Sequence, residues 1–92
     1  MNEIAKELME RLRASLPEHD LRWEKEPAAE GLAGSALTAT AKGKSFTMQF
    51  VAGKIPLPEE PELHSFLEEI VDDFVNFFTD SIYKKEKFTK VV

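Results

Sequence analysis

The feature that most constrains the fold of this chain is a segment, residues 63–80, that is apolar over half of a helical circumference. Placed at about 100° per residue, its large apolar side chains fill one arc of about 180°, and its acidic and polar side chains fill the rest. The apolar arc comprises Leu63, Phe66, Leu67, Ile70, Val71, Phe74, Val75, Phe77 and Phe78. A surface helix needs an apolar stripe of only a little over about 100°. We therefore expect this helix to contact two different environments.

The middle of the arc is expected to cover a β-sheet, whereas one flank has two possible neighbours. The first is an N-terminal helix packed alongside on the same sheet face. The second is another copy of the protein or a partner protein, because four phenylalanines on one helix exceed what a three-stranded sheet face requires. The residues that we predict for such a protein contact are Trp23, Phe66, Val75, Phe77, Phe78 and Ile82.

The N-terminal segment, residues 1–16, has the pattern of another amphipathic helix, because its apolar residues recur at steps of three and four. They are Ile4, Ala5, Leu8, Met9, Leu12 and Leu16. Asn2 precedes this stripe and is a favourable N-cap. Pro17 ends the helix, because the residue before a proline is disfavoured in the helical conformation.

The middle of the chain predicts three β-strands. Residues 21–26 alternate enough for a short strand, in which Trp23 is either a core residue or a partly exposed anchor for a partner. A β-hairpin is predicted over residues 35–42 and 45–52. Its type II′ turn has Gly43 at the first central position.

The predicted hairpin has a definite register. It places Ala39 opposite Met48 and Leu37 opposite Phe50, so that every apolar side chain falls on one face of the sheet. The other face carries polar residues that suit contact with solvent. They are Thr38, Thr40, Thr47 and Gln49.

Three prolines in residues 53–62 exclude a central strand or a helix interior from this segment. Pro58 and Pro61 are tolerated in a first helical turn, so the second helix is expected to begin between them and to run to about Asp80 or Tyr83. The tail, residues 84–92, is basic with scattered apolar residues, and it predicts either a frayed end or a short extra strand.

These elements predict an α+β fold with the order α-β-β-β-α. A chain of 92 residues and 10.4 kDa has room for one hydrophobic core. We predict a single domain over residues 1–83, a three-stranded antiparallel meander with both helices packed on one face, followed by the basic tail at residues 84–92. A domain of this size buries a smaller fraction of its surface than a larger one does, so a partner subunit would stabilise it.

Charge is unevenly distributed along the chain, whose formal net charge is −5. Residues 59–83 sum to −8, whereas residues 35–58 and 84–92 each sum to +3. The basic hairpin and tail are therefore candidates for contact with an anion or a nucleic acid. The lysines concerned are Lys42, Lys44, Lys54, Lys84, Lys85 and Lys87.

The predicted element order is shared with two kinds of protein, although no motif is shared. Double-stranded RNA-binding domains have this order, but they place lysines at the start of the second helix to contact phosphates. The corresponding residues here read PEEPE, so duplex binding is not expected. The order, the small size and the acidity also resemble type III secretion chaperones, which dimerise and bind effectors, at the level of the fold alone.

The sequence carries no pattern that predicts catalysis, a cofactor or a metal site. The acidic pairs of residues 68–73 point outward from a straight helix, so they indicate a solvated face rather than a cation site. His64 stands four residues before Glu68 and is expected to pair with it, and His19 is expected to be a turn residue. The serines lack a nucleophile elbow, and the glycines lack phosphate-loop spacing.

We therefore expect a protein that is not an enzyme. The chain has no cysteine, which excludes disulfides and thiolate chemistry, and no segment with the pattern of a signal peptide or a membrane span. A cytoplasmic location is the expectation. The favoured function is a protein-binding or adaptor domain that forms a homodimer through the wide face of the second helix. The alternative is a nucleic-acid or anion-binding accessory module that uses the basic hairpin and tail.

Overall fold

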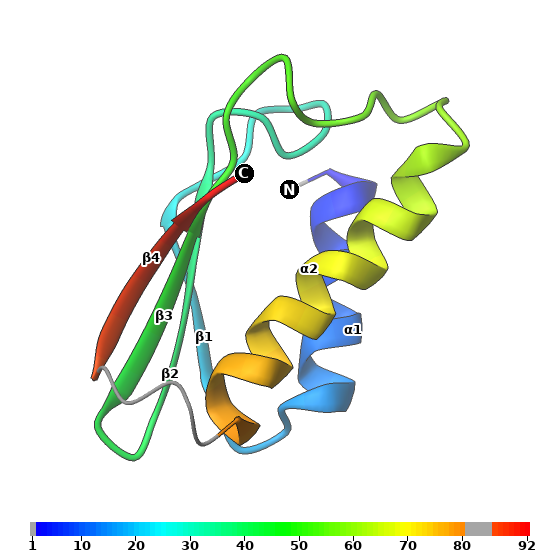
Figure 1. Cartoon of the computed structure of the whole chain (residues 1–92). Coiled ribbons are helices and arrows are strands. Elements are labelled where there is room, and N and C mark those ends of the chain that lie inside the picture. The colour runs from blue at the N-terminus through cyan, green and yellow to red at the C-terminus, as the bar shows by residue number, and fades with distance from the viewer. Residues whose placement is uncertain (1, 81–85) are drawn as a thin grey trace.

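The structure is a computed structural model, and it describes residues 2–80 and 86–92. Its elements follow in the order α1 (Glu3–Ser15), β1 (Asp20–Lys25), β2 (Ala36–Ala41), β3 (Lys44–Gln49), α2 (Glu62–Thr79) and β4 (Lys87–Val91). The four strands form one sheet in the order β1-β2-β3-β4, and both helices lie on the same face of it (Figure 1). The predicted α+β class and the placement of both helices are therefore confirmed.

The sheet is four-stranded and mixed, so the predicted three-stranded antiparallel meander with the order α-β-β-β-α is corrected by one strand. The additional strand, β4, comes from the basic tail and pairs in parallel with β3, with Ser45 beside Lys87 and Gln49 beside Val91. A parallel neighbour requires a long crossover connection. Helix α2 lies within this connection, because it carries the chain back to the end of the sheet at which β3 begins (Figure 1).

The β2–β3 hairpin keeps its predicted faces but has a different turn. Leu37 pairs with Met48 rather than with Phe50. The central turn residues are Lys42 and Gly43, with φ of 52° and 81°. Positive φ at both positions is the requirement of a type I′ turn, whereas the predicted type II′ turn requires it at the first position only. Because the pairing shifts by two residues, the side-chain period of a strand, each side chain stays on its predicted face.

Both helices begin close to the predicted positions. Helix α1 starts after Asn2, whose side-chain oxygen accepts a hydrogen bond of 2.7 Å from the N–H of Ala5. The amide nitrogen of the same side chain donates to the carbonyls of Ala28 and Gly31 at 2.8 and 2.7 Å, so the cap also fastens the loop before β2 to the helix. Helix α2 starts after Pro61 and ends at Thr79, with Asp80 as its C-cap, which confirms the earlier of the two predicted ends; the other, Tyr83, lies outside the described residues.

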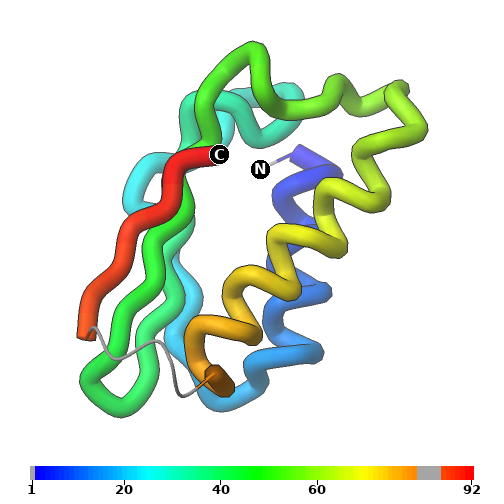
Figure 2. Tube along the Cα trace, in the orientation of Figure 1, coloured from blue at the N-terminus to red at the C-terminus, as the bar shows by residue number. Residues whose placement is uncertain are grey.

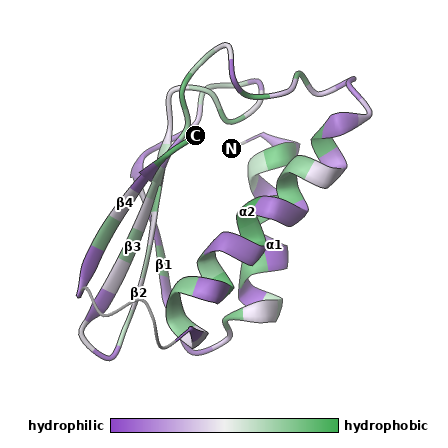
Figure 3. Cartoon of the chain, in the orientation of Figure 1, coloured by the Kyte–Doolittle hydropathy of each residue, from purple (hydrophilic) through white to green (hydrophobic). Residues whose placement is uncertain are grey.

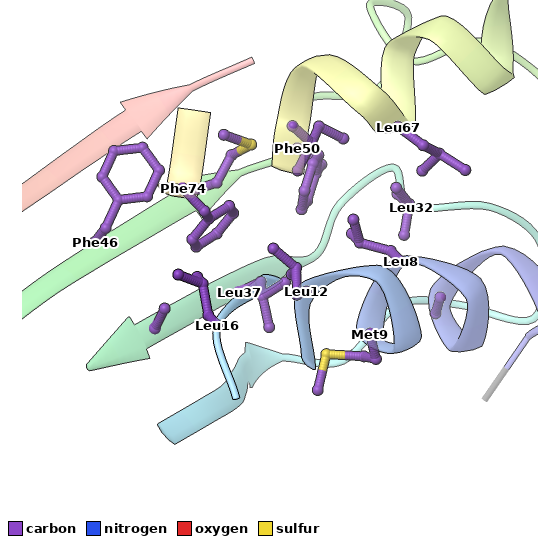
Figure 4. Close-up of a cluster of buried hydrophobic side chains, with 14 of the residues drawn as sticks. Leu8, Met9, Leu12, Leu16, Leu32, Leu37, Phe46, Phe50, Leu67 and Phe74 are labelled. Carbon is purple, nitrogen blue, oxygen red and sulfur yellow. The ribbon is translucent and has the colours of Figure 1, made fainter. Parts of the chain in front are cut away.

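The hydrophobic core lies between the sheet and the two helices, whose apolar residues face it (Figures 3 and 4). Phe46 of β3 lies at the centre of an aromatic group, with its ring centroid 4.8 Å from Phe74, 5.1 Å from Phe77 and 5.7 Å from Phe88. These contacts join β3, α2 and β4. Leu32, from the loop that precedes β2, is fully buried and closes the other end of the core. The small β2 residues leave room for these large side chains.

The two helices run in the same direction across the sheet. Their N-termini and the C-terminal end of β4 lie toward one end of the molecule, and the β2–β3 turn lies at the other (Figure 2). Within the described ranges, no helix is long and apolar enough to cross a membrane.

Candidate functional site

The wide apolar face of α2 is divided among three neighbours in the same chain. Its buried row faces the core and comprises Leu67, Ile70, Phe74 and Phe77. On one flank, Nδ1 of His64 lies 2.9 Å from a guanidinium nitrogen of Arg11, so that flank faces α1. On the other flank, a carboxylate oxygen of Asp73 lies 2.7 Å from Nζ of Lys90, so that flank faces β4. The other five apolar residues of the arc are half-buried and pack against the core.

The residues predicted for a protein contact do not form one surface. Phe77 is 0% exposed, so the prediction of a partner contact for this side chain is corrected to a position in the core. Three others are half-buried and pack against the core: Phe66, Val75 and Phe78. Phe66 is seven residues before Asp73 and shares the β4 flank, whereas Val75 lies toward α1. The predicted contact residue Ile82 lies outside the described residues.

Trp23 lies on the core face of β1, opposite Leu37, and is half-buried. Its indole nitrogen Nε1 is buried without a hydrogen-bond partner in the described part of the chain. A buried indole N–H ordinarily has a partner. The side chain thus has features of both predicted roles, core packing and a partly exposed anchor.

The lysines predicted for anion binding are dispersed over the molecule. Lys42 is exposed in the β2–β3 turn, and Lys44 is half-buried at the start of β3. Lys54 is exposed in the loop after β3, at the opposite end of the sheet. Lys87 is exposed on β4. Two further predicted lysines lie outside the described residues: Lys84 and Lys85.

A cavity of about 430 Å³ lies beside the β2–β3 turn. Leu16 and Phe78 form part of its apolar wall, and Glu18, Lys42 and Lys44 are its charged lining residues. The C-terminal ends of both α1 and α2 border it, and such ends carry partial negative charge. The two lysines are therefore partly offset by Glu18 and by the helix dipoles, which makes the cavity a weak candidate for an anion.

His19 contributes to the same cavity as a packing residue. Its ring lies 4.4 Å from the ring of Phe78 in an edge-to-face arrangement. Burial lowers the pKa of His19 below its usual 6.5, while Glu18 acts to raise it and Lys42 to lower it. Its Nδ1 is buried and has no hydrogen-bond partner in the two described segments. Burial beside an aromatic side chain thus favours the neutral form of the His19 ring.

The other histidine joins α1 to α2. A guanidinium nitrogen of Arg11 lies 3.2 Å from Glu7 and 2.9 Å from Nδ1 of His64. Nε2 of His64 lies 3.0 Å from Glu68, which confirms the predicted pair. All four side chains are at the surface, and no three His, Asp or Glu residues of the described chain come close enough together to hold a metal ion.

No helix or strand of the described residues covers the sheet face opposite the helices (Figure 1), which we call the uncovered face, although Thr38 on it is only 8% exposed rather than open to solvent as predicted. The threonines that were predicted for this face make hydrogen bonds across strands, with 2.6 Å between the hydroxyls of Thr38 and Thr47 and 3.2 Å between those of Thr40 and Ser45. Strand alternation adds Lys87, Thr89 and Val91 of β4 to the same face.

Two of the exposed large apolar side chains lie together at one corner of this sheet. Val91 is 56% exposed and Val51 is 40% exposed. The N–H of Val51 donates a hydrogen bond of 2.8 Å to the carbonyl of Val92, so Val51 lies beside the end of β4. The sequence gives only a weak signal for β4, because Lys90 interrupts the apolar residues Phe88 and Val92 on one face, so the tail predicts either a strand or a frayed end.

Comparisons with known proteins identify no relative of this chain. No family model, no curated protein and no solved structure matches this chain. The function is therefore inferred from the geometry of the chain itself.

Proposed function

We propose that this chain is a non-enzymatic protein-binding domain that acts as a homodimer. The observation that carries the proposal is the position of its exposed apolar side chains relative to the sheet. Val51 and Val91 lie at the end of β4, which is an edge strand, and among the described residues β4 has a neighbouring strand on one side only. An open strand edge with exposed apolar side chains is a ready site for pairing with another chain.

The proposed contact surface is the edge of the sheet, whereas the sequence predicts the wide face of α2. That face is shared by the core, α1 and β4, so it has less apolar surface to offer than the sequence predicts. Of the predicted contact residues, Phe66 lies on the flank of α2 that faces β4, and Phe77 contacts Phe88 of β4 from the core, with ring centroids 6.2 Å apart. A second copy at this edge would cover apolar surface that a small domain leaves in water.

A nucleic-acid or anion-binding module is the second candidate, and less supports it. Lys54 lies far from the turn lysines, and the C-terminal ends of both helices offset Lys42 and Lys44. Charge reversal of Lys42 and Lys44 would separate the candidates. A gel shift that weakens with salt and is lost in this variant would support anion binding, and the absence of any shift at low salt would remove it.

Two matched substitutions test the proposed dimer. Val91 and Leu57 are both 56% exposed, but only Val91 lies on the edge strand. Sedimentation velocity should give about twice 10.4 kDa for the unmodified chain and for Leu57→Lys. Val91→Lys should shift the protein toward the monomer, because it replaces apolar contact surface at the strand edge with a charge. A monomeric unmodified chain at high micromolar concentration contradicts the proposal.

A further inference from the structure

The backbone of β4 directs hydrogen-bonding groups outward at three residues, and no strand of the described segments pairs with them. The carbonyl of Glu86 accepts from the N–H of Ser45 at 2.7 Å, and Val92 donates to Gln49 at 2.8 Å, so both ends of the strand bond toward β3. Inward and outward bonding alternate along a strand. The residues whose N–H and C=O point away from β3 are therefore Lys87, Thr89 and Val91.

These outward groups are evenly spaced, and Thr89 is in the middle. In an antiparallel pair of two identical strands, a two-fold axis at Thr89 places Thr89 opposite the partner's Thr89 and Lys87 opposite the partner's Val91. All three outward residues of each strand are then paired, with about six hydrogen bonds. Moving the axis by one residue leaves one outward residue of each five-residue strand without a counterpart.

The side chains fit this register. Lys87 meets the partner's Val91, so its aliphatic stem covers an apolar side chain that is 56% exposed in the single chain. The two copies of Lys87 stand at opposite ends of the strand pair, about 13 Å apart at about 3.3 Å per residue, which exceeds the Debye length at physiological salt. On the helix face, Lys90 is already neutralised by Asp73. No two like charges oppose each other directly.

From this geometry we infer that β4 pairs antiparallel with the β4 of a second copy, about a two-fold axis at Thr89. The inference rests on the proposed homodimer and specifies its interface. It joins two four-stranded sheets into one continuous sheet. On the uncovered face, Thr38, Thr47 and Thr89 are neighbours on successive strands, so the axis extends this row of hydroxyls into the partner's sheet.

Single cysteines test the register, because the chain has none of its own. Directly opposed residues of this kind have Cα atoms about 5.5 Å apart, within the range of a disulfide. Thr89→Cys should give a cross-linked dimer on a non-reducing gel after oxidation with diamide. Val91→Cys and Thr47→Cys should stay single chains, since their counterparts lie well beyond that range. Cross-linking by Val91→Cys without Thr89→Cys would overturn the inference.

A proline substitution tests pairing through β4 separately from the formation of a dimer. Thr89→Pro removes an outward N–H but leaves the bonds to β3, which Phe88 and Lys90 make, so the chain should fold and sediment as a monomer. Thr89→Val keeps the N–H and should remain a dimer. If Thr89→Pro is a folded dimer, this interface is wrong while the proposed homodimer stands. If the unmodified chain is a monomer, both fall.

Discussion

Nζ of Lys90 lies 2.7 Å from a carboxylate oxygen of Asp73, so an ion pair joins the last strand to the helix that precedes it in sequence. Asp73 belongs to the acidic arc of α2 that the sequence predicts to be solvated. In the structure this carboxylate marks the flank on which β4 docks. The side chains of Lys90 and Asp73 are 45% and 35% exposed, so the pair is a surface contact of modest strength.

Lys90→Met should therefore lower the free energy of unfolding by about 0.5 kcal/mol, because it removes the charge and keeps the stem. Urea denaturation measures the change, which should shrink as salt is added. Lys25→Met is the control, since Lys25 is exposed on β1 and has no ion pair within the described residues. Equal losses in both variants would show that the ion pair does not fasten β4.

The adjacent residues Phe77 and Phe78 should respond very differently to truncation. Phe77 is 0% exposed and packs on Phe46, so Phe77→Ala should cost about 3–5 kcal/mol through loss of burial and a cavity. Phe78 is half-buried against His19, so Phe78→Ala should cost about 1–2 kcal/mol. Thermal or urea unfolding compares the two. A larger loss for Phe78 would contradict the assignment of Phe77 to the core.

The same pair shows what the sequence predicts and what it leaves open. The helical period of residues 63–80 places both phenylalanines in the apolar arc, and this arc is what buries the helix. Periodicity does not show which residues of the arc are fully buried and which are only half-buried. Their burial depends on which element lies beside each flank of the helix. The neighbours Arg11 and Lys90 come from distant parts of the chain.

The sequence does not decide whether the tail forms strand β4, for a related physical reason. In KFTKVV the core side of the strand holds Lys90 between Phe88 and Val92, so the apolar alternation is broken. Lys90 is accommodated there because its charge pairs with Asp73 of α2, a contact that the local sequence does not reveal. The two faces of the hairpin, by contrast, are predictable from the sequence, because alternation fixes the face even when the pairing is shifted by two residues.

Acidification should destabilise the protein through His19. Burial lowers the pKa of His19 in the folded chain below its usual 6.5, so the unfolded state binds a proton that the folded state does not. The contribution of the neutral ring is complete above about pH 6.5 and is lost as the pH falls from there through the lower folded pKa.

The variant His19→Phe isolates this effect, since it retains the ring contact with Phe78 and shares every other titrating group. Denaturation at a series of pH values should show the unmodified chain losing stability relative to His19→Phe as the pH falls below about 6.5. A constant difference over this series would mean that His19 titrates alike in the folded and unfolded chains.

The β2–β3 turn offers a stabilising substitution. Lys42 has φ of 52°, a left-handed conformation that Asn adopts more readily than Lys does. Lys42→Asn should raise the free energy of unfolding by about 0.5 kcal/mol. Gly43→Ala, at φ of 81°, should lower it by about 1 kcal/mol, although no described atom beyond Gly43 and its two chain neighbours lies within 4 Å of the added carbon. Opposite signs would argue against a type I′ turn.

The amide hydrogen of Thr89 tests the proposed edge pairing most directly. It points away from β3, so it is exposed in a single chain and hydrogen-bonded in the two-fold dimer. Hydrogen exchange followed by NMR should show it protected at high micromolar concentration and exchanging faster on dilution, while Phe88, bonded to β3, stays protected. Rapid exchange of the Thr89 amide at every concentration, with Phe88 protected, would contradict pairing through β4.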